Sequence, residues 1–475
     1  MEIFGEYDVV VTGGGTSGVA AAISAARAGG KTILLERLGV LGGQMNVSGP
    51  PGFAYAHMFN ARWEQIIGGI MQETHERLLK QGHALPHLDH DFRAGFSFSY
   101  VDPDWWGLLI FEMMQENGVE LLLHSFAVDV LKEGKAVRGV IVENTSGRQV
   151  VLGKVVIDCT GEGDISVRAG APYEQVPKED LQPHTIAFTA DGVDWEKVLN
   201  YIRENPADFI FLVHPYLNWS EKQIHDRIRR VKDITEIAEV RGFISLRDRG
   251  VASGEWHGKS GLGFFLLPRE GGVIQAHFQH SSHVPQCDCT DARDLTYGEI
   301  ESRRQITIAW KFVKKYLPGF EKAYITRVTP ELRIRESRRI MGDYVLTSDD
   351  VVEARKFPDV IGKSAFHKGG HHTATTDTIT YSKIVWPKEG GSHDIPYRCL
   401  VPRNVENLLV AGKPISTDRD AYHRFLQQNM VTGQAAGVAA ALCARQNITP
   451  RELEKDVSEL QEILIQQGAI LYGTH

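Results

Sequence analysis

The sequence lacks a long apolar run and an excess of positive charge. Its apolar stretches are shorter than the ~18 residues that a membrane-spanning helix requires, so we expect no membrane span. The 52 Lys and Arg residues are outnumbered by 60 Asp and Glu residues, and the formal net charge of −8 offers no general attraction to nucleic acid. The N-terminus shows no basic region followed by an apolar one, so we expect a cytoplasmic protein.

Cysteine is also scarce. The five cysteines are an odd number without a CxxC pair: Cys159, Cys287, Cys289, Cys399 and Cys443. This pattern favours a reducing compartment and argues against a dithiol redox relay. The remaining composition, with 42% hydrophobic and 24% charged residues over 475 positions, is typical of a globular protein of about two or three domains.

The most informative motif lies near the N-terminus. Residues 7–12 (YDVVVT) form a β-branched apolar run that predicts a buried parallel strand. A GGGTSG turn follows, then a helix over about 17–28 and a second strand over 31–36 (KTILLE). In such a unit the first glycine permits the tight turn, the second lets a pyrophosphate approach the backbone, and the third lets the helix pack closely on the strand.

Glu36 ends the second strand, where a carboxylate accepts hydrogen bonds from the hydroxyls of an adenosine ribose. Its negative charge also disfavours a 2′-phosphate on that ribose. A glycine motif between two strands, with an acid at the end of the second, predicts a dinucleotide site at Gly13, Gly15 and Gly18. The alternative is a glycine-rich turn without a ligand.

The nucleotide-binding region is discontinuous. A β-meander over about 124–153 feeds a further strand that ends at Thr160 and Gly161. Much later the chain returns with VENLLVAGKPIS, which predicts a strand ending at Gly412. The segment MVTGQAAGVAAALCA then predicts an alanine-rich helix that begins near Gln434.

The intervening region mixes strands and amphipathic helices. Its pattern predicts helices over 194–205, 219–242 and 295–317, and strands over 261–270 and 271–280. This order predicts an antiparallel sheet with helices on one side. We therefore assign residues 1–170 and 396–450 to the nucleotide-binding domain, 52–100 to a lid-like excursion of loop and helix within it, 171–395 to an inserted substrate domain, and 451–475 to a C-terminal helix.

The motifs VVVTGGGTSGVAAAISAARAGGKTILLER, VIDCTGEGD and NLLVAGKPIS with GQAAGVAAA resemble FAD-dependent oxidoreductases of the glutathione-reductase-like superfamily. RIRESRRIMGDYVLT and IPYRCLVPRNVENLLVAGK resemble a bacterial family of FAD-dependent oxidoreductases whose members are mostly uncharacterised. The resemblance covers nearly the whole chain. It implies an α/β fold, with a Rossmann-like FAD-binding domain (a parallel sheet plus a β-meander) and an inserted α+β substrate domain.

The resemblance also implies which residues hold FAD. Those for the pyrophosphate and ribose are Gly13, Gly15, Thr16, Ser17, Gly18 and Glu36. Those toward the ribityl chain are Arg37, Gly42, Gly43 and Gln44, while Val128 would contact adenine through its backbone. Those bordering the cofactor are Thr160, Gly161, Asp164 and Gly412. Those facing the isoalloxazine are Arg424, Asn429, Gln434 and Ala435, where a helix N-terminus stabilises a reduced, anionic flavin.

No histidine follows the glycine pair at Met45 or Asn46, so we expect the FAD to be bound non-covalently. His57 is the remaining candidate for a covalent link.

A cluster of nitrogen and sulfur donors raises the question of a metal. Its members are His277, His280, His283, Cys287 and Cys289. Imidazole and thiolate are zinc ligands, but strand geometry sends His277 and His280 to opposite faces and no standard spacing is met. We predict no metal and favour a polar pocket edge, with metal binding as the open alternative.

Candidate catalytic residues lie late in the chain. His371 and His372 follow two glycines, and a histidine with a pKa near neutrality suits a general base. A surface turn is the alternative for this pair. Arg335 either binds a substrate carboxylate or joins ion pairs between the domains. His423 and Arg424 lie beside the predicted flavin helix.

The favoured function is an FAD-dependent dehydrogenase or oxidase. A small polar substrate (an alcohol, an amine or a sugar-like compound) gives hydride to flavin N5, and oxygen or another external acceptor takes the electrons. No second GxGxxG follows a strand, so we expect no separate NAD(P)H domain. The alternatives are fumarate-reductase-like reduction of an activated C=C bond, and a flavin-bearing RNA-modifying or RNA-binding protein, which the acidic charge disfavours.

Overall fold

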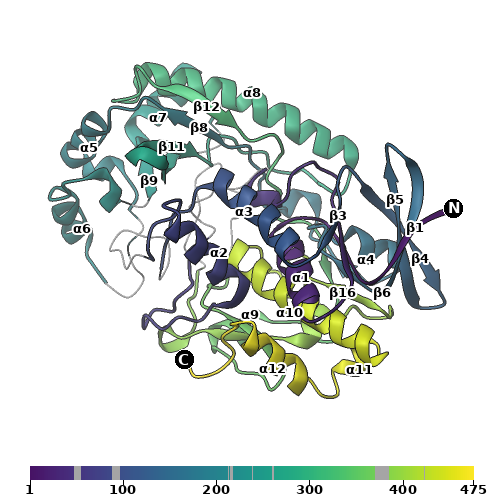
Figure 1. The fold of residues 1–475 in the computed structure, drawn as a ribbon. Coiled ribbons are helices and arrows are strands. Elements are labelled where there is room, and N and C mark those ends of the chain that lie inside the picture. The colour runs from purple at the N-terminus through teal and green to yellow at the C-terminus, as the bar shows by residue number, and fades with distance from the viewer. Residues whose placement is uncertain are drawn as a thin grey trace.

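The computed structural model describes residues 1–47, 55–87, 97–211, 213, 218–237, 239–258, 261–369, 384–421 and 423–475. It shows a mixed α/β fold built around two sheets, each with its own hydrophobic core (Figure 1). The predicted fold class is confirmed. The exact domain boundaries stay a prediction.

The larger sheet has seven strands in the order β3-β2-β1-β6-β5-β4, with β16 also paired to β6. Their bounds are β1 Glu2–Thr12, β2 Thr32–Leu35, β3 Glu120–Leu122, β4 Phe126–Glu133, β5 Ala136–Asn144, β6 Gly147–Asp158 and β16 Leu408–Val410. β1 pairs in parallel with β2 and β6, whereas β4, β5 and β6 form an antiparallel meander. The end of β6 pairs with β16, which joins residues distant in the sequence.

Two helices at the centre of the molecule cover this sheet (Figure 1): α1 (Thr16–Arg27) and α10 (Leu426–Gln446). A Cβ on Gly433 would lie 2.1 Å from the Ser17 carbonyl oxygen, and one on Gly437 would lie 2.1 Å from that of Ala21. Only glycine permits this approach of the two helix backbones. Because α10 begins at Leu426, its N-terminus lies about two turns before the Gln434 that the sequence predicted.

The second sheet has five antiparallel strands in the order β12-β8-β11-β10-β9. Their bounds are β8 Phe188–Asp191, β9 Glu239–Gly242, β10 Leu262–Pro268, β11 Ile274–Phe278 and β12 Tyr324–Val328. One face carries Phe188, Phe264 and Phe278, which belong to a core shared with the surrounding helices. Those helices are α5 Trp195–Glu204, α7 Ile244–Ser253 and α8 Ala292–Tyr316, and α8 lies along the outside of the sheet (Figure 1).

The helix predicted over 219–242 is wrong in its second half. Helix α6 covers only Glu221–Ile228, and residues 239–242 form strand β9. β9 pairs antiparallel with β10, and this long-range pairing outweighs the local helical pattern.

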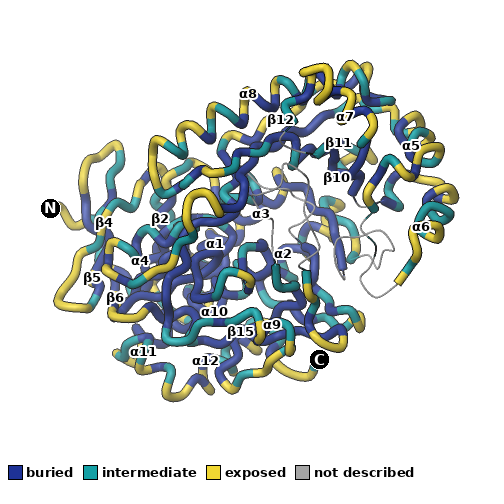
Figure 2. The backbone as a smooth tube through the Cα atoms, turned by 180° about the vertical axis from the view of Figure 1, so that it is seen from behind, coloured by how far each residue is buried: buried dark blue, intermediate teal, exposed yellow. Residues whose placement is uncertain are grey.

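The remaining elements connect or flank the two sheets. They are η1 Gly43–Met45, α2 Gly69–Lys80, α3 Pro103–Glu116, α4 Asp164–Ala169, β7 Tyr173–Glu174, β13 Arg339–Ile340, α9 Ser348–Val352, β14 Val360–Ser364, β15 His393–Pro396, α11 Pro450–Leu453 and α12 Ser458–Gln466. Buried residues are concentrated where the large sheet meets α1 and α10 (Figure 2). Among the described residues, no helix has the length and apolarity needed to cross a membrane.

Candidate active site

The glycine loop between β1 and α1 has the geometry of a phosphate cradle. Gly13 has φ of +94°, and a Cβ on Gly18 would lie 1.8 Å from the Gly13 carbonyl oxygen, so neither position accepts a side chain. A Cβ on Gly15 would meet no atom within 4 Å. Open space therefore lies in front of Gly15, where the N-terminal amides of α1 attract an anion.

Glu36 is tied into this loop. Its carboxylate accepts a hydrogen bond from the Gly14 amide at 2.6 Å and from the Leu38 amide at 2.9 Å. These bonds hold a largely buried carboxylate beside the glycine loop, where a ribose would follow the pyrophosphate.

A buried carboxylate shapes the end of β6. Asp158 accepts hydrogen bonds from the amide and hydroxyl of Thr160, at 3.0 and 2.7 Å. It also accepts from the amide and hydroxyl of Ser166, both at 2.7 Å. Four donors satisfy a side chain that is fully buried, so Asp158 fixes the Thr160–Gly161 turn and the start of α4.

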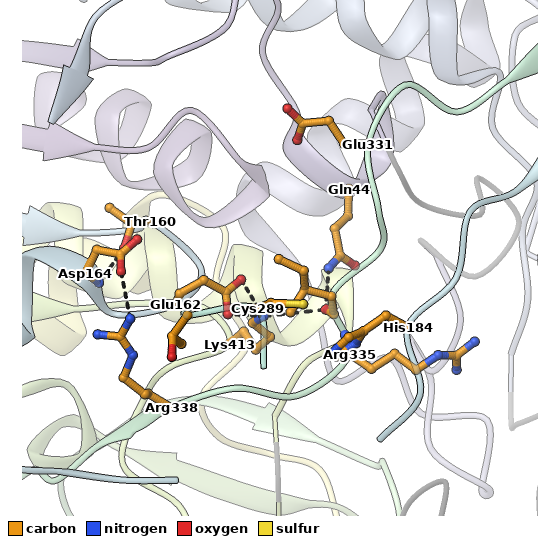
Figure 3. Close-up of polar contacts among 12 residues, drawn as sticks. Gln44, Thr160, Glu162, Asp164, His184, Cys289, Glu331, Arg335, Arg338 and Lys413 are labelled. Carbon is orange, nitrogen blue, oxygen red and sulfur yellow. Dashed lines mark hydrogen bonds and ion pairs between the residues drawn. The ribbon is translucent and has the colours of Figure 1, made fainter. Parts of the chain in front are cut away.

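A lysine and a glutamate face each other at the base of the site (Figure 3). The Lys413 ammonium contacts both carboxylate oxygens of Glu162, at 2.7 and 2.8 Å. Gln44 donates from its amide to the Ile334 carbonyl at 3.0 Å, which ties η1 to the segment after β12. At the other end, Arg37 forms a 2.6 Å ion pair with Glu331.

These groups line one cleft, called here the cofactor cleft, with an empty volume of about 800 Å³. It is lined by Gly13, Gly15, Thr16, Ser17, Glu36, Arg37, Leu38, Gly43, Gln44, Val47, Cys159, Thr160, Gly161, Glu162, Glu331, Leu332, Ile334, Lys413, Leu426 and Asn429. The cleft thus joins the glycine loop, the end of β6 and the first turn of α10.

Several predicted cofactor residues do not line the cleft. Gly412 has φ of +87°, and a Cβ there would lie 2.7 Å from the Ser17 hydroxyl. Asp164 pairs with Arg338 at 3.0 Å (Figure 3), and Val128 lies at a bulge in β4. The Gln434 side chain accepts from the Ile70 amide at 3.1 Å, at the start of α2. Gly18, Gly42, Arg424 and Ala435 also lie outside the lining set.

Arg335 and the histidines predicted for catalysis fall into three groups. Arg335 is buried, and its guanidinium lies 3.2 Å from Nδ1 of His280. His423 is buried, with its Nε2 3.0 Å from Nε2 of His393, and burial lowers its pKa to about 4. His371 and His372 lie outside the described residues.

The possible metal ligands that lie together in the structure differ from the cluster considered from the sequence. Cys287 and Cys289 lie with His184, their ligand atoms within 4.8 Å of one another, whereas His277 and His280 have other partners. Nδ1 of His184 accepts from the Arg335 amide at 3.1 Å, and its Nε2 is 2.9 Å from the Cys287 carbonyl oxygen. Both ring nitrogens are therefore occupied, which favours a structural role for His184. That the chain binds no metal stays a prediction.

Sequence reasoning missed Lys413, Glu162 and the strip from Glu331 to Ile334. Lys413 directly follows Gly412, and Glu162 stands between two predicted cofactor residues, so both had a positional signal. The strip had none, because it belongs to the inserted region and pairs with Thr185, far away in the sequence. His184 had no sequence signal either, because Cys287, whose carbonyl oxygen it contacts, lies 103 residues further along the chain.

The cleft fits FAD. The open space before Gly15 suits a pyrophosphate, and Glu36 lies where an adenosine ribose follows. The cleft then continues along Gly43 and Gln44 to Asn429, in the first turn of α10. A nucleotide-binding fold with a split sheet and an inserted sheet above such a cleft defines a flavoprotein of the dinucleotide-binding class.

The sequence profile of the family described as "FAD dependent oxidoreductase" matches residues 8–464. The chain therefore belongs to the FAD-dependent oxidoreductase family and is an oxidoreductase that uses FAD.

Individual known proteins match less extensively. A dihydrolipoyl dehydrogenase from Trypanosoma brucei brucei is 52% identical over 56 residues, which cover 12% of this chain and 12% of that relative. A geranylgeranyl bacteriochlorophyll reductase-like structure from Thermoplasma acidophilum aligns with a TM-score of 0.46 and 12% identity, covering 98% of this chain and 84% of that one. A p-nitrophenol 4-monooxygenase from Pseudomonas putida aligns with a TM-score of 0.43 and 10% identity, covering 99% and 87%.

Proposed function

We propose that this enzyme oxidises a small polar substrate, an alcohol, an amine or a sugar-like compound, and passes the electrons to oxygen or another external acceptor. When bound, FAD accepts hydride from such a substrate. The observation that carries the proposal is the end of the cleft at Leu426 and Asn429, in the first turn of α10. The partial positive charge there stabilises the negative charge that a flavin gains on reduction.

The proposed roles of the side chains follow from their positions. Gly13, Gly15 and the first turn of α1 bind the pyrophosphate, and Glu36 orients the ribose. The Lys413 ammonium and Glu162 carboxylate fix the floor of the cleft. The substrate's proton also needs an acceptor, and on the sequence alone we assign this role to His371 or His372, with His423 as the alternative.

The test is anaerobic mixing of the purified yellow protein with a panel of alcohols, amines and sugars while the visible flavin absorbance is followed. Bleaching by members of this panel, reversed by oxygen, is the expected result. If none bleaches the flavin, and photoreduced enzyme is reoxidised by an activated alkene, the protein is instead a fumarate-reductase-like C=C reductase.

A further inference from the structure

The five-stranded sheet has a second face that is polar and yet buried. The strand register places Glu239, Phe265, His277 and Thr189 side by side on this face, called here the polar face. The exposed fractions of Glu239, His277 and Thr189 are 7%, 3% and 4%. Antiparallel sheets that pack one face on helices usually show the other face to water. Buried polar side chains in such a position need partners.

Part of the polar face borders a cavity with an empty volume of about 600 Å³. It is lined by Met45, Asn46, Pro103, Asp104, Thr189, Leu267, Arg269, Gln275, His277, Thr326, Arg327 and Thr329. Met45 and Asn46 continue directly from Gly43 and Gln44, which line the cofactor cleft. The cavity and the cleft therefore share η1 as a wall.

His277 lines this cavity and has an unused hydrogen-bonding atom. Its Nδ1 lies 2.9 Å from the Thr189 hydroxyl, whereas its Nε2 has no hydrogen-bond partner among the described residues. Burial, together with the charges of Arg327 and Arg333, lowers the pKa of His277 to about 3. The ring is therefore neutral. When its Nδ1–H donates to the Thr189 hydroxyl, its Nε2 can accept a hydrogen bond from another hydroxyl.

Arg333 is a buried cation that has no counter-ion among the described residues. Its backbone is fixed by two hydrogen bonds with Thr185, and its guanidinium donates to the Gln279 side-chain carbonyl at 3.1 Å. Its Nε has no hydrogen-bond partner within the described part of the chain. Burial and the nearby charge of Arg424 lower the pKa of Arg333 to about 9. A buried charge of this kind is costly until an anion neutralises it.

The surroundings of Arg333 carry further positive charge. Arg424 immediately precedes the N-terminal turn of α10, and Arg335 lies against His280, one residue beyond Gln279. In contrast, the neighbouring Arg241 is neutralised by Glu239 at 2.5 Å. The local field around Arg333 therefore favours a negatively charged ligand.

We propose that the polar face binds the substrate as a small hydroxy carboxylate, with its carboxylate on Arg333 and a hydroxyl on Nε2 of His277. This inference rests on the proposed function, since it assigns a class to the substrate that is oxidised. Gln279, which accepts from Arg333, lies two residues after His277 and just beyond the end of β11. Two residues of extended chain span only about 7 Å, so a small molecule is long enough to contact both Arg333 and His277.

The first experiment measures binding to the FAD-loaded enzyme by calorimetry, under nitrogen. D-Gluconate and L-lactate are compared with the uncharged sorbitol and 1,2-propanediol. We expect the carboxylates to bind at least tenfold more tightly than their uncharged counterparts. The variant Arg333→Gln is expected to lose this preference, and Arg333→Lys to keep part of it.

The second experiment compares melting temperatures without ligand. Arg333→Gln removes an uncompensated buried charge and is expected to melt no lower than the parent enzyme. The matched control Arg241→Gln leaves Glu239 buried and unpaired, and it is expected to melt lower. Equal affinity for charged and uncharged ligands, or unchanged carboxylate affinity in Arg333→Gln, would overturn the proposal.

The two proposals fail separately. Carboxylate binding that depends on Arg333 but never bleaches the flavin supports the anion site and contradicts the oxidation of that ligand. Bleaching by uncharged alcohols or amines that is unaffected by Arg333→Gln supports oxidation and contradicts the anion site.

Discussion

At the scale of single residues, Glu36 performs two tasks with one carboxylate. One oxygen accepts from the Gly14 amide and the other from the Leu38 amide, so the side chain shapes the glycine loop before any ligand binds. The same group is the acceptor proposed for the ribose hydroxyls. Loop geometry and nucleotide affinity therefore depend on the same negative charge.

The variant Glu36→Gln tests this double role. An amide keeps one acceptor oxygen but turns an N–H toward one of the two backbone amides, which leaves a donor facing a donor. We expect FAD affinity to fall about tenfold to a hundredfold, measured by titrating apoprotein and following flavin fluorescence. Glu112→Gln, on the exposed side of α3, is the control. Unchanged FAD affinity in Glu36→Gln would show that the carboxylate does not contribute to FAD binding.

At the scale of elements, the contact between α1 and α10 holds the cofactor cleft together. The two helices contribute Thr16, Ser17, Leu426 and Asn429 to its lining. Their backbones approach closely at Gly433 and Gly437. A change in helix spacing therefore changes the width of the cleft.

Gly437→Ala is the matching prediction. In an exposed helix, replacing glycine by alanine stabilises by about 1 kcal/mol. Here the new Cβ would lie 2.1 Å from both the Ala21 carbonyl oxygen and the Ser24 hydroxyl, so we expect a loss of about 1–3 kcal/mol in unfolding free energy. Urea denaturation measures it, with Gln446→Ala at the exposed end of α10 as control. A gain in stability would contradict the close packing.

The helices and strands also show how much of the fold can be predicted from the sequence. The β1–α1–β2 unit and Glu36 were predictable because strand, turn and helix signals are local and lie in one short segment. The start of α10 was not, because Leu426 to Asn429 are held by burial rather than by an amphipathic pattern. Strand β9 and the His184–Cys287 contact depend on partners far along the chain, which a local pattern does not encode.

At the scale of the whole molecule, buried histidines make stability depend on pH. Burial lowers the pKa of His184 and His277 to about 3 and that of His423 to about 4, whereas the unfolded chain titrates near pH ~6.5. Below that pH the unfolded state binds more protons, so stability falls as the solution is acidified. Glu454 acts in the opposite direction, because burial raises its pKa to about 7.

Burial lowers the pKa of His87, His280, His367 and His393 in the same way. We expect the histidines together to outweigh Glu454 and to lower the unfolding free energy by several kcal/mol, on the order of 1 kcal/mol each, between pH ~7 and pH ~5.5. Urea denaturation at the two pH values measures the difference. In Glu454→Gln the opposing term is absent, so the fall is expected to steepen by about 1–2 kcal/mol. If Glu454→Gln were equally stable at both pH values, these histidines would have to take up protons in the folded state as well.

Strand β6 has a consequence for biosynthesis. Its first half pairs with β5, which precedes it, but its end pairs with β16, which leaves the ribosome roughly 250 residues later. Lys413 and then the first turn of α10, at Leu426, come after β16 in the chain. A nascent chain therefore exposes the glycine loop and Glu36 long before the opposite side of the cleft exists. We expect FAD to be captured only near the end of translation, after the inserted sheet has already emerged.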